Sequence, residues 1–164
     1  MTEPGDKASS PRPDHGGDLF RLVYSSRATV DGPAAFEKLT QAVVARSQAN
    51  NAALDVTGVL LAHEGWFLQA LEGPRRHVST IFGVIGRDLR HVQMELLGAD
   101  LAEARLFGRW SMCARAITPE AAPALQALDL GGEFAPHRLS ATQATKLQVA
   151  VSKLRPVAEL REAG

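Results

Sequence analysis

Two short apolar runs joined by a tight connection constrain the fold of this chain more than any other feature. Residues Val56 to Ala62 and Trp66 to Leu71 are rich in β-branched, aromatic and aliphatic side chains, and His63-Glu64-Gly65 connects them. A connection of this length that contains glycine is typical of a β-hairpin. The two runs therefore predict an antiparallel pair of strands, to which the remaining elements must be added.

The segments on either side of the hairpin alternate between strand and helix patterns. Strands are predicted at Leu19 to Tyr24, Val92 to Leu97 and Leu106 to Ala114. Helices are predicted at Ala35 to Ala49 and from about Val78 to Arg87, where apolar residues recur at helical spacing. The order strand, helix, strand, strand, helix, strand is that of the ferredoxin-like arrangement, and one further strand follows it. We expect an α+β fold with a mixed sheet of about five strands and two helices on one face.

A helical extension is predicted after this sheet. Thr118-Pro119-Glu120 has the composition of a helix start, which predicts a helix near Pro119 to Leu128 that ends at Gly131-Gly132. A further helix is predicted from Ser140 to Leu154, with Pro156 closing it. Its narrow apolar stripe must pack on a partner surface, either the exposed face of the sheet or a second subunit.

These patterns divide the chain into three parts. Residues 1–17 are rich in Pro, Gly, Ser and charge and nearly lack large apolar groups, so we expect a disordered tail. Residues 18–116 form the predicted domain, and residues 117–164 form the helical extension, an element for packing, dimerisation or output. The given chain shows no further domain, so we expect a signal to leave through another protein or through self-association.

Charge and cysteine content exclude several classes of protein. Lys plus Arg and Asp plus Glu number 18 each, so no global field favours nucleic acid or an anionic membrane. No apolar stretch approaches the roughly 20 residues that span a bilayer, and a cytoplasmic location is expected. Cys113 is the only cysteine and is interpreted as a small buried hydrophobe. The histidines and carboxylates show neither metal-ligand spacing nor paired acid–base groups, so we expect no metal and no enzyme activity.

Gln69 is a polar residue on an apolar strand. Strand alternation places Phe67, Gln69 and Leu71 on one face of the strand, and Trp66, Leu68 and Ala70 on the other. If helices cover the first face, an unpaired amide there costs on the order of 1–3 kcal/mol. The ordinary interpretation is a core glutamine paired with backbone. The alternative is that a ligand provides the missing partners.

A second group of polar residues could contribute to the same face. Tyr24 is the only tyrosine and, by alternation, shares a face with Phe20 and Leu22. Ser47, Asn50 and Asn51 gather at the end of the first predicted helix, where helix capping is the simplest interpretation. A planar heteroaromatic ligand with imide edges would require such mixed donors and acceptors, with Val43 and Phe67 as apolar walls.

Six blocks of sequence stand in order along the chain. They are Leu22-Val-Tyr-Ser-Ser-Arg-Ala28, Ser47-Gln-Ala-Asn-Asn51, Asp55-Val-Thr-Gly-Val-Leu60, Trp66-Phe-Leu-Gln-Ala-Leu-Glu-Gly73, Arg87-Asp-Leu-Arg-His91 and Phe107-Gly-Arg-Trp-Ser-Met112. Together they resemble the successive motifs of the BLUF family of blue-light sensors that use flavin, in its short single-domain type, and the resemblance spans about Leu19 to Ala116. The family's ferredoxin-like sheet, with the flavin ring between two helices, agrees with the element order predicted above.

The resemblance implies a role for each matched residue. It implies that Tyr24 donates an electron and a proton under light, and that the Gln69 amide bridges the tyrosine hydroxyl and the flavin. It further implies that Asn51 bonds the flavin ring edge, with Asn50 beside it and Ser47 one turn back. Met112 and Trp110 match a pair on the last strand that reports on the state of the glutamine.

The remaining implications concern the flavin tail and the output. Asp88, Arg90 and His91 fall where the family contacts the ribityl-phosphate side or closes the second helix. The resemblance implies FAD, with FMN and riboflavin as alternatives, because Gly83 and Val84 occupy a stretch where several relatives place a basic residue near the phosphate. A protein partner of unknown identity and a homo-oligomer are also expected.

Two other functions compete with the photoreceptor. One is a light-independent flavin-binding or redox-sensing module on the same fold. The other is an acylphosphatase-like enzyme, which would need a catalytic Arg and Asn in a phosphate-cradling loop after the first strand. Because Arg27 stands there alone, the enzyme ranks last.

Overall fold

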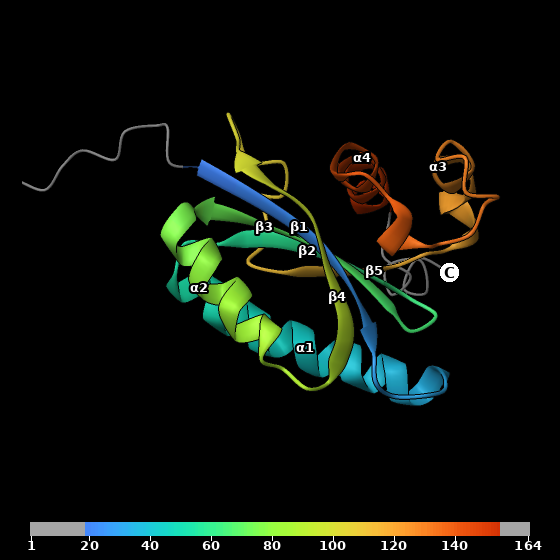
Figure 1. The fold of residues 1–164 in the computed structure, drawn as a ribbon, viewed down its shortest axis with the longest axis horizontal. Coiled ribbons are helices and arrows are strands. Elements are labelled where there is room, and N and C mark those ends of the chain that lie inside the picture. Colours follow the sequence, from blue (N-terminus) through green and yellow to red (C-terminus); the bar gives the residue numbers. More distant parts are fainter. Residues whose placement is uncertain (1–18, 155–164) are drawn as a thin grey trace, which may run out of the picture.

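The predicted hairpin forms the centre of a five-stranded sheet in the computed structural model, which describes residues 19–154. The predicted tail of residues 1–17 and Pro156 lie outside the described residues. The sheet order is β4-β1-β3-β2-β5, in which β2 and β5 are parallel and the other neighbours are antiparallel (Figure 1). The strands are β1 (Leu19–Ala28), β2 (Thr57–His63), β3 (Trp66–Pro74), β4 (His91–Leu101) and β5 (Cys113–Ala116).

Helices cover both faces of this sheet. One side carries α1 (Pro33–Ala53) and α2 (Arg75–Gly86), and the other carries α3 (Ala122–Gln126) and α4 (Ala141–Ser152), as Figure 1 shows. This arrangement confirms the predicted ferredoxin-like α+β fold. It also selects between the two surfaces considered for the last helix, because Ala144, Leu147 and Val151 of α4 are buried in one cluster with strand residues.

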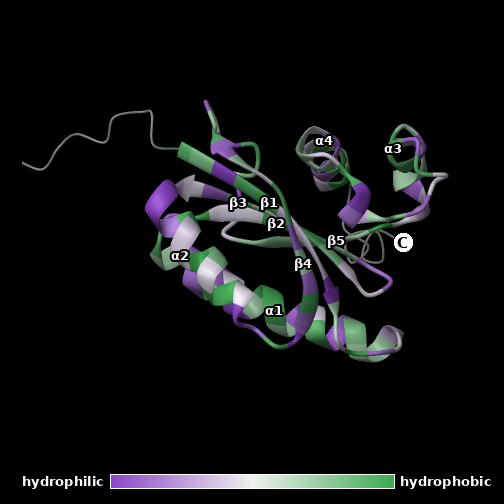
Figure 2. Cartoon of the chain, in the orientation of Figure 1, coloured by the Kyte–Doolittle hydropathy of each residue, from purple (hydrophilic) through white to green (hydrophobic). Residues whose placement is uncertain are grey.

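The helix boundaries follow local sequence signals. α1 begins with Pro33, whose missing N–H is no loss in the first turn of a helix. α4 begins after Ser140, which forms a capping box: its side chain accepts from the Gln143 backbone, and the Gln143 side chain accepts from the Ser140 backbone. Figure 2 shows hydrophobic and hydrophilic residues interspersed along α1 and α2, as expected of helices that bury one side only.

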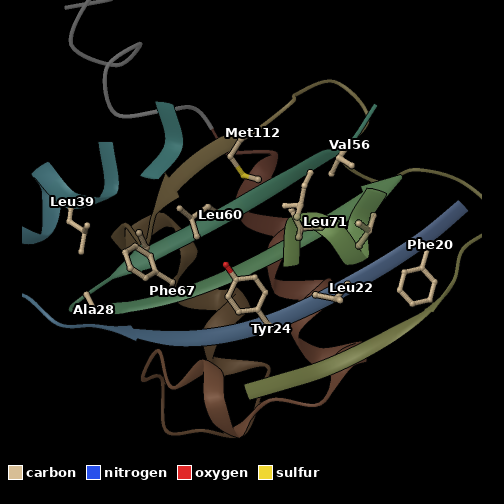
Figure 3. Packing of buried hydrophobic residues seen from close by; sticks show 13 residues of the cluster. Phe20, Leu22, Tyr24, Ala28, Leu39, Val56, Leu60, Phe67, Leu71 and Met112 are labelled. Atoms are coloured by element: carbon tan, nitrogen blue, oxygen red, sulfur yellow. The ribbon is translucent and has the colours of Figure 1, made fainter. Parts of the chain in front are cut away.

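Two hydrophobic clusters lie on opposite faces of the sheet. The cluster under α1 and α2 includes Tyr24 and Phe67, whose side chains project from neighbouring strands in Figure 3. The cluster under α3 and α4 includes Val23 and Leu68. Adjacent residues therefore point to opposite faces, which confirms the predicted alternation along both strands. Cys113 is buried, and burial raises the pKa of its thiol.

Two predicted elements are replaced in part by other structure, whereas β1, β4 and α1 only run beyond their predicted bounds. The strand predicted at Leu106 to Ala114 is confined to β5, Cys113–Ala116, and residues 106–112 form an irregular connection. The reason is that the buried Glu72 carboxylate accepts the backbone N–H groups of Leu106 and Phe107, which are therefore unavailable to a strand ladder.

The helix predicted near Pro119 to Leu128 is divided into a 3-10 turn, Pro119–Ala121, and the short α3. Pro123 contributes to the division, because proline cannot donate the backbone hydrogen bond that a continuous helix requires. A second 3-10 turn, Pro136–Arg138, precedes α4. Within residues 19–154, no helix combines the length and apolarity needed to cross a bilayer.

Candidate functional site

A cavity of about 1000 Å³ lies between α1 and α2, with the sheet as its floor. All ten residues predicted to bind a cofactor line it. They are Tyr24, Val43, Ser47, Asn50, Asn51, Phe67, Gln69, Asp88, Arg90 and His91. The volume lies at the upper end of the range of about 300–1000 Å³ that is usual for small-molecule and cofactor pockets.

Tyr24 and Gln69 meet on the floor of the cavity. They are direct partners in the antiparallel pairing of β1 and β3, and both side chains point to the face covered by α1 and α2. The Tyr24 hydroxyl donates a hydrogen bond to Oε1 of Gln69. Figure 3 shows this hydroxyl extending across β3 toward the region of Leu60. Burial raises the pKa of the Tyr24 phenol far above its ordinary value of 10.0, and the charge of Asp88 adds to the effect.

Met112 contacts the other end of the Gln69 amide. Nε2 of Gln69 lies 3.5 Å from the Met112 sulfur, which is a weak acceptor. Gly58 of β2 makes this approach possible, because a Cβ atom there would meet the Met112 methyl carbon at 3.2 Å and would clash with the Ala70 carbonyl. The Gln69 amide is therefore held between one hydroxyl donor and one thioether.

The end of α1 fastens the segment that carries Met112. Nδ2 of Asn51 donates to the Ser111 carbonyl at 2.8 Å, and Nε2 of Gln48 donates to the Met112 carbonyl at 3.1 Å. Oδ1 of Asn51 is buried without a partner. Ser47 is half-buried and Asn50 is exposed at the cavity rim. Asn51 thus positions the protein itself and still has an unsatisfied acceptor in the cavity wall.

The loop after α2 closes one end of the cavity with an ion pair. The Arg90 guanidinium donates to both Asp88 carboxylate oxygens at 2.6 to 3.1 Å. These hydrogen bonds lower the pKa of Asp88 from 3.8 to about 2. The Arg90 backbone N–H also donates to Asp88. Asp88 and Arg90 therefore satisfy each other and order the loop.

His91 links this loop to the floor of the cavity. One ring nitrogen, Nδ1, lies 2.7 Å from the Ser26 hydroxyl, and Nε2 lies 2.8 Å from the Ile85 carbonyl. Because a carbonyl only accepts, Nε2 donates to the Ile85 carbonyl, and Nδ1 shares a hydrogen bond with the Ser26 hydroxyl. The ring meets Tyr24 edge to face, with centroids 6.5 Å apart. His91 holds the end of α2 against β1 beside the phenol.

Trp110 lies apart from the other predicted site residues. It precedes β5 and packs against the cluster under α3 and α4, with the Arg109 and Arg115 guanidinium groups over its ring. Met112, two residues later, belongs to the opposite cluster. The prediction that both residues lie on the last strand is therefore wrong, because the segment crosses from one face to the other before β5 begins. The photoactive role of Trp110 stays a prediction.

Sequence reasoning missed two arginines and a leucine at the cavity. Arg46 of α1 and Arg87 after α2 line it and are exposed, and Leu89 lines it with 89% of its surface exposed. Exposed arginines on a helix carry no pattern that separates a ligand contact from a solvated face. Arg87 stands in the block Arg87-Asp-Leu-Arg-His91, but the resemblance assigns a role there to Asp88, Arg90 and His91 alone.

The donor set fits a flat ligand with mixed donors and acceptors along its edge. The unpaired Oδ1 of Asn51 lacks a donor, and a ring N–H would supply one. Val43, Leu39 and Ile85 supply apolar walls. The amide group can turn round and so exchange its donor and acceptor ends. A phenol hydrogen-bonded to such an amide can release and recover a proton without any other titratable side chain at the contact.

A known family matches this part of the chain. The model of the BLUF family, described as "Sensors of blue-light using FAD", matches residues 19–113. These residues include the whole cavity lining. The matched segment ends at the first residue of β5 and does not reach the helices α3 and α4.

Curated relatives share the same region. The "Blue light- and temperature-regulated antirepressor BluF" of Escherichia coli K12 is 37% identical over 94 residues, which are 57% of this chain and 23% of that protein. The "Photoactivated adenylate cyclase subunit alpha-like protein FB" of Euglena gracilis is 30% identical over 94 residues, which are 57% of this chain and 9% of that protein. The match therefore covers less than a quarter of either relative.

Solved structures extend the comparison to the C-terminal helices. "BlrB - a BLUF protein, dark state structure" is 29% identical with a TM-score of 0.66, over 85% of this chain and 100% of that one. "BlsA photo-activated state" is 21% identical with a TM-score of 0.76, over 85% of this chain and 98% of that one. The second likeness shows the fold alone, and that fold includes the region beyond the matched family segment.

Proposed function

The chain belongs to the BLUF family of blue-light sensors that use FAD, and from this premise we propose that Tyr24 and Gln69 are its photoactive pair. One observation carries the proposal: the only tyrosine of the chain donates to the Gln69 amide on the floor of a cofactor-sized cavity. When bound, the flavin supplies blue-light absorption and, in its excited state, an oxidant.

Tyr24 is suited to give up an electron and a proton together. Its phenol is fully buried, so the neutral form persists at all physiological pH values. A radical cation left by electron loss alone would be a charge in a low-dielectric site, which is costly. The Gln69 oxygen, already in contact with the hydroxyl, gives the proton a defined path. Return of the electron and the proton to Tyr24 restores the neutral phenol.

Gln69 can adopt two hydrogen-bonding states, because one end of its amide group accepts hydrogen bonds and the other end donates them. In the present state Oε1 accepts from Tyr24, and Nε2 faces the Met112 sulfur. Rotation or tautomerisation of the amide exchanges donor and acceptor at these positions. Because the Met112 sulfur cannot donate, the rotated amide oxygen gains nothing from it. We propose that Met112 favours one state of Gln69 and is displaced in the other.

We propose FAD as the flavin. Arg46 and Arg87 place two exposed guanidinium groups on the cavity wall, and guanidinium groups bind phosphate oxygens well. The resemblance predicts that Asp88 and Arg90 contact the flavin tail. In this proposal their ion pair orders the loop after α2 that closes one end of the cavity. Heating the protein and identifying the released chromophore distinguishes FAD from FMN and riboflavin, neither of which carries a diphosphate.

We propose that the output is contact with a protein partner and not catalysis by this chain. The support is the family, together with the antirepressor relative from Escherichia coli. The identity of that partner, self-association and a cytoplasmic location stay predictions. The division of the chain at residues 17 and 116 also stays a prediction, although the matched segment agrees with a boundary near β5.

An absorption spectrum before, during and after blue illumination tests the proposal. We expect a purified yellow protein whose flavin band moves to longer wavelength under light and returns in darkness. Bound flavin without a reversible change would overturn the photoreceptor and favour a light-independent flavin-binding or redox-sensing module. Absence of flavin under loading conditions would overturn both.

A further inference from the structure

Four buried polar atoms without a hydrogen-bond partner lie on the face of the sheet opposite the cavity. They are Ser25 Oγ, Arg115 Nε, His137 Nδ1 and Gln148 Oε1, among the residues that the structure describes. The fifth such atom, Oδ1 of Asn51, belongs to the cavity side. Buried polar groups are normally paired. The layer between the sheet and the C-terminal helices therefore holds most of the unpaired buried polar atoms among the described residues.

Gln148 is the most informative member of this set. It lies on α4 with no exposed surface, among the apolar residues Leu147 and Val151. Its Nε2 donates to the backbone carbonyl of Leu68 at 3.4 Å, which is the only hydrogen bond between α4 and the sheet within residues 19–154. The rest of the α4 interface is apolar contact.

The acceptor of this hydrogen bond is directly bonded to the proposed switch. Leu68 precedes Gln69 on β3, so the carbonyl that Gln148 contacts forms the peptide bond to Gln69. The side chains of Leu68 and Gln69 point to opposite faces of the sheet, so only the backbone joins the Gln148 contact to the Gln69 amide. Gln148 therefore contacts from α4 the peptide unit that carries the switching amide.

Packing alone does not account for a glutamine at this position. An apolar residue of similar volume would fill the same space without leaving an amide oxygen unpaired, and such replacements are often neutral or stabilising. The contact is also at the long end of the hydrogen-bond range, so a small shift of β3 would make or break it. Ser25, paired with Leu68 across β1 and β3, holds a second unsatisfied oxygen in the same layer.

We propose that Gln148 is a positioning residue that couples α4 to the state of Gln69 through the Leu68 carbonyl. The inference rests on the proposed photoreceptor function. A change at Gln69 moves its own peptide unit, the Leu68 carbonyl moves with it, and the Gln148 amide keeps or loses its acceptor. Ser25 provides the layer with an alternative polar partner. Because coupling is reciprocal, removing Gln148 must also change the relative stability of the lit state.

The test uses Gln148→Met in the full chain, with Gln126→Met as the matched control. Methionine keeps the length of glutamine and removes its amide, and Gln126 is exposed on α3. We expect Gln148→Met to bind flavin and to show the full light-induced spectral shift. Its dark recovery rate should change by about fivefold or more. Hydrogen exchange of α4 should differ between light and dark in the wild type and not in Gln148→Met.

Three outcomes decide between the alternatives. The inference would be overturned if Gln148→Met recovered in darkness at the wild-type rate and showed the same light-dependent change in α4 hydrogen exchange as the wild type. If Gln148→Met does not fold, Gln148→Leu replaces it, because it also removes the amide that contacts the Leu68 carbonyl, and unchanged recovery there has the same meaning. A wild type that cycles optically but shows no light effect on α4 exchange overturns the inference alone. A wild type without any optical cycle overturns the proposed function.

Discussion

The Glu72 carboxylate accepts the backbone N–H of Phe107 at 2.6 Å, although 35 residues separate them. Glu72 is fully buried and also accepts from the Arg21 guanidinium at 2.8 Å. It lies on β3 three residues after Gln69, and Phe107 begins the connection that brings Met112 to the Gln69 amide. One strand therefore holds both the Gln69 amide and the anchor of the segment that contacts it.

Replacing Glu72 with glutamine should lower the free energy of unfolding by about 2–4 kcal/mol. The amide cannot accept from Arg21 and two backbone N–H groups as a carboxylate does, and Arg21 loses its charged partner and keeps the Ala104 carbonyl. Chemical denaturation of both proteins measures the difference. Glu64→Gln at the exposed hairpin tip is the control and should change the stability by less than about 0.5 kcal/mol. Equal effects of the two substitutions would contradict the anchoring role of Glu72.

Replacing Tyr24 with phenylalanine should abolish the light-induced spectral shift without preventing flavin binding. The ring remains to fill the floor of the cavity, but the hydroxyl that contacts Gln69 is lost. Gln69→Leu should give the same result from the other side of the hydrogen bond. The measurement is the light-minus-dark absorption difference of flavin-loaded protein. A normal photocycle in either variant would remove that residue from the proposed pair.

The sheet and the floor of the site could be predicted because strand geometry leaves little freedom. Because side chains alternate between the two faces along a strand, Gln69 and Phe67 were predicted to share one face, and Tyr24 and Val23 to lie on opposite faces. Both assignments are confirmed. The turn His63-Glu64-Gly65 also fixed the pairing of β2 with β3, since a tight hairpin permits few registers.

The segment before β5 could not be predicted, because a long-range contact decides its structure. Its apolar pattern favours a strand, which would place Trp110 and Met112 on one face. The Glu72 carboxylate takes the N–H groups at its start, and Asn51 takes a carbonyl near its end. Partners 34 and 60 residues away in sequence leave no local signal. Arg46 and Arg87 were missed for a similar reason: only the fold brings them to one cavity.

The tyrosinate absorbance of the folded protein should not develop near pH 10. Tyr24 is the only tyrosine, so this absorbance reports one residue. Burial raises its folded-state pKa far above the ordinary 10.0, so the folded protein holds a proton that the unfolded chain loses. The corresponding stabilisation is complete below pH 10 and decreases as the pH rises above it. A tyrosinate signal with a midpoint near 10 in folded protein would show that the phenol is accessible.

Replacing Gly58 with alanine should destabilise the protein by about 1–3 kcal/mol and disturb the contact between Met112 and Gln69. The added Cβ would clash with the Ala70 carbonyl and meet the Met112 methyl at 3.2 Å, so β2 or Met112 must move. Thermal unfolding and the position of the dark flavin band report the two effects.

Gly83→Ala on α2 is the control for Gly58→Ala, because nothing lies within 4 Å of the Cβ position there. It should raise the stability by about 0.5–1 kcal/mol, as expected for glycine within a helix. If Gly58→Ala resembled Gly83→Ala in both measurements, the close approach at Gly58 would have no role in holding Met112.

Replacing Arg90 with glutamine should raise the pKa of Asp88 from about 2 toward 3.8, because the charged hydrogen bonds from Arg90 are the main cause of the low value. A depressed carboxyl pKa stabilises the folded state above pH 3.8, and this contribution is lost as the pH falls toward 2. Between pH 7 and 4 the Asp88 carboxylate should therefore stay ionised and keep its ion pair with Arg90. The carboxyl carbon shift of Asp88 measures the pKa directly. Arg76→Gln, at the other end of α2, should leave it unchanged; a wild-type value near 3.8 would mean that the ion pair does not order the loop in solution.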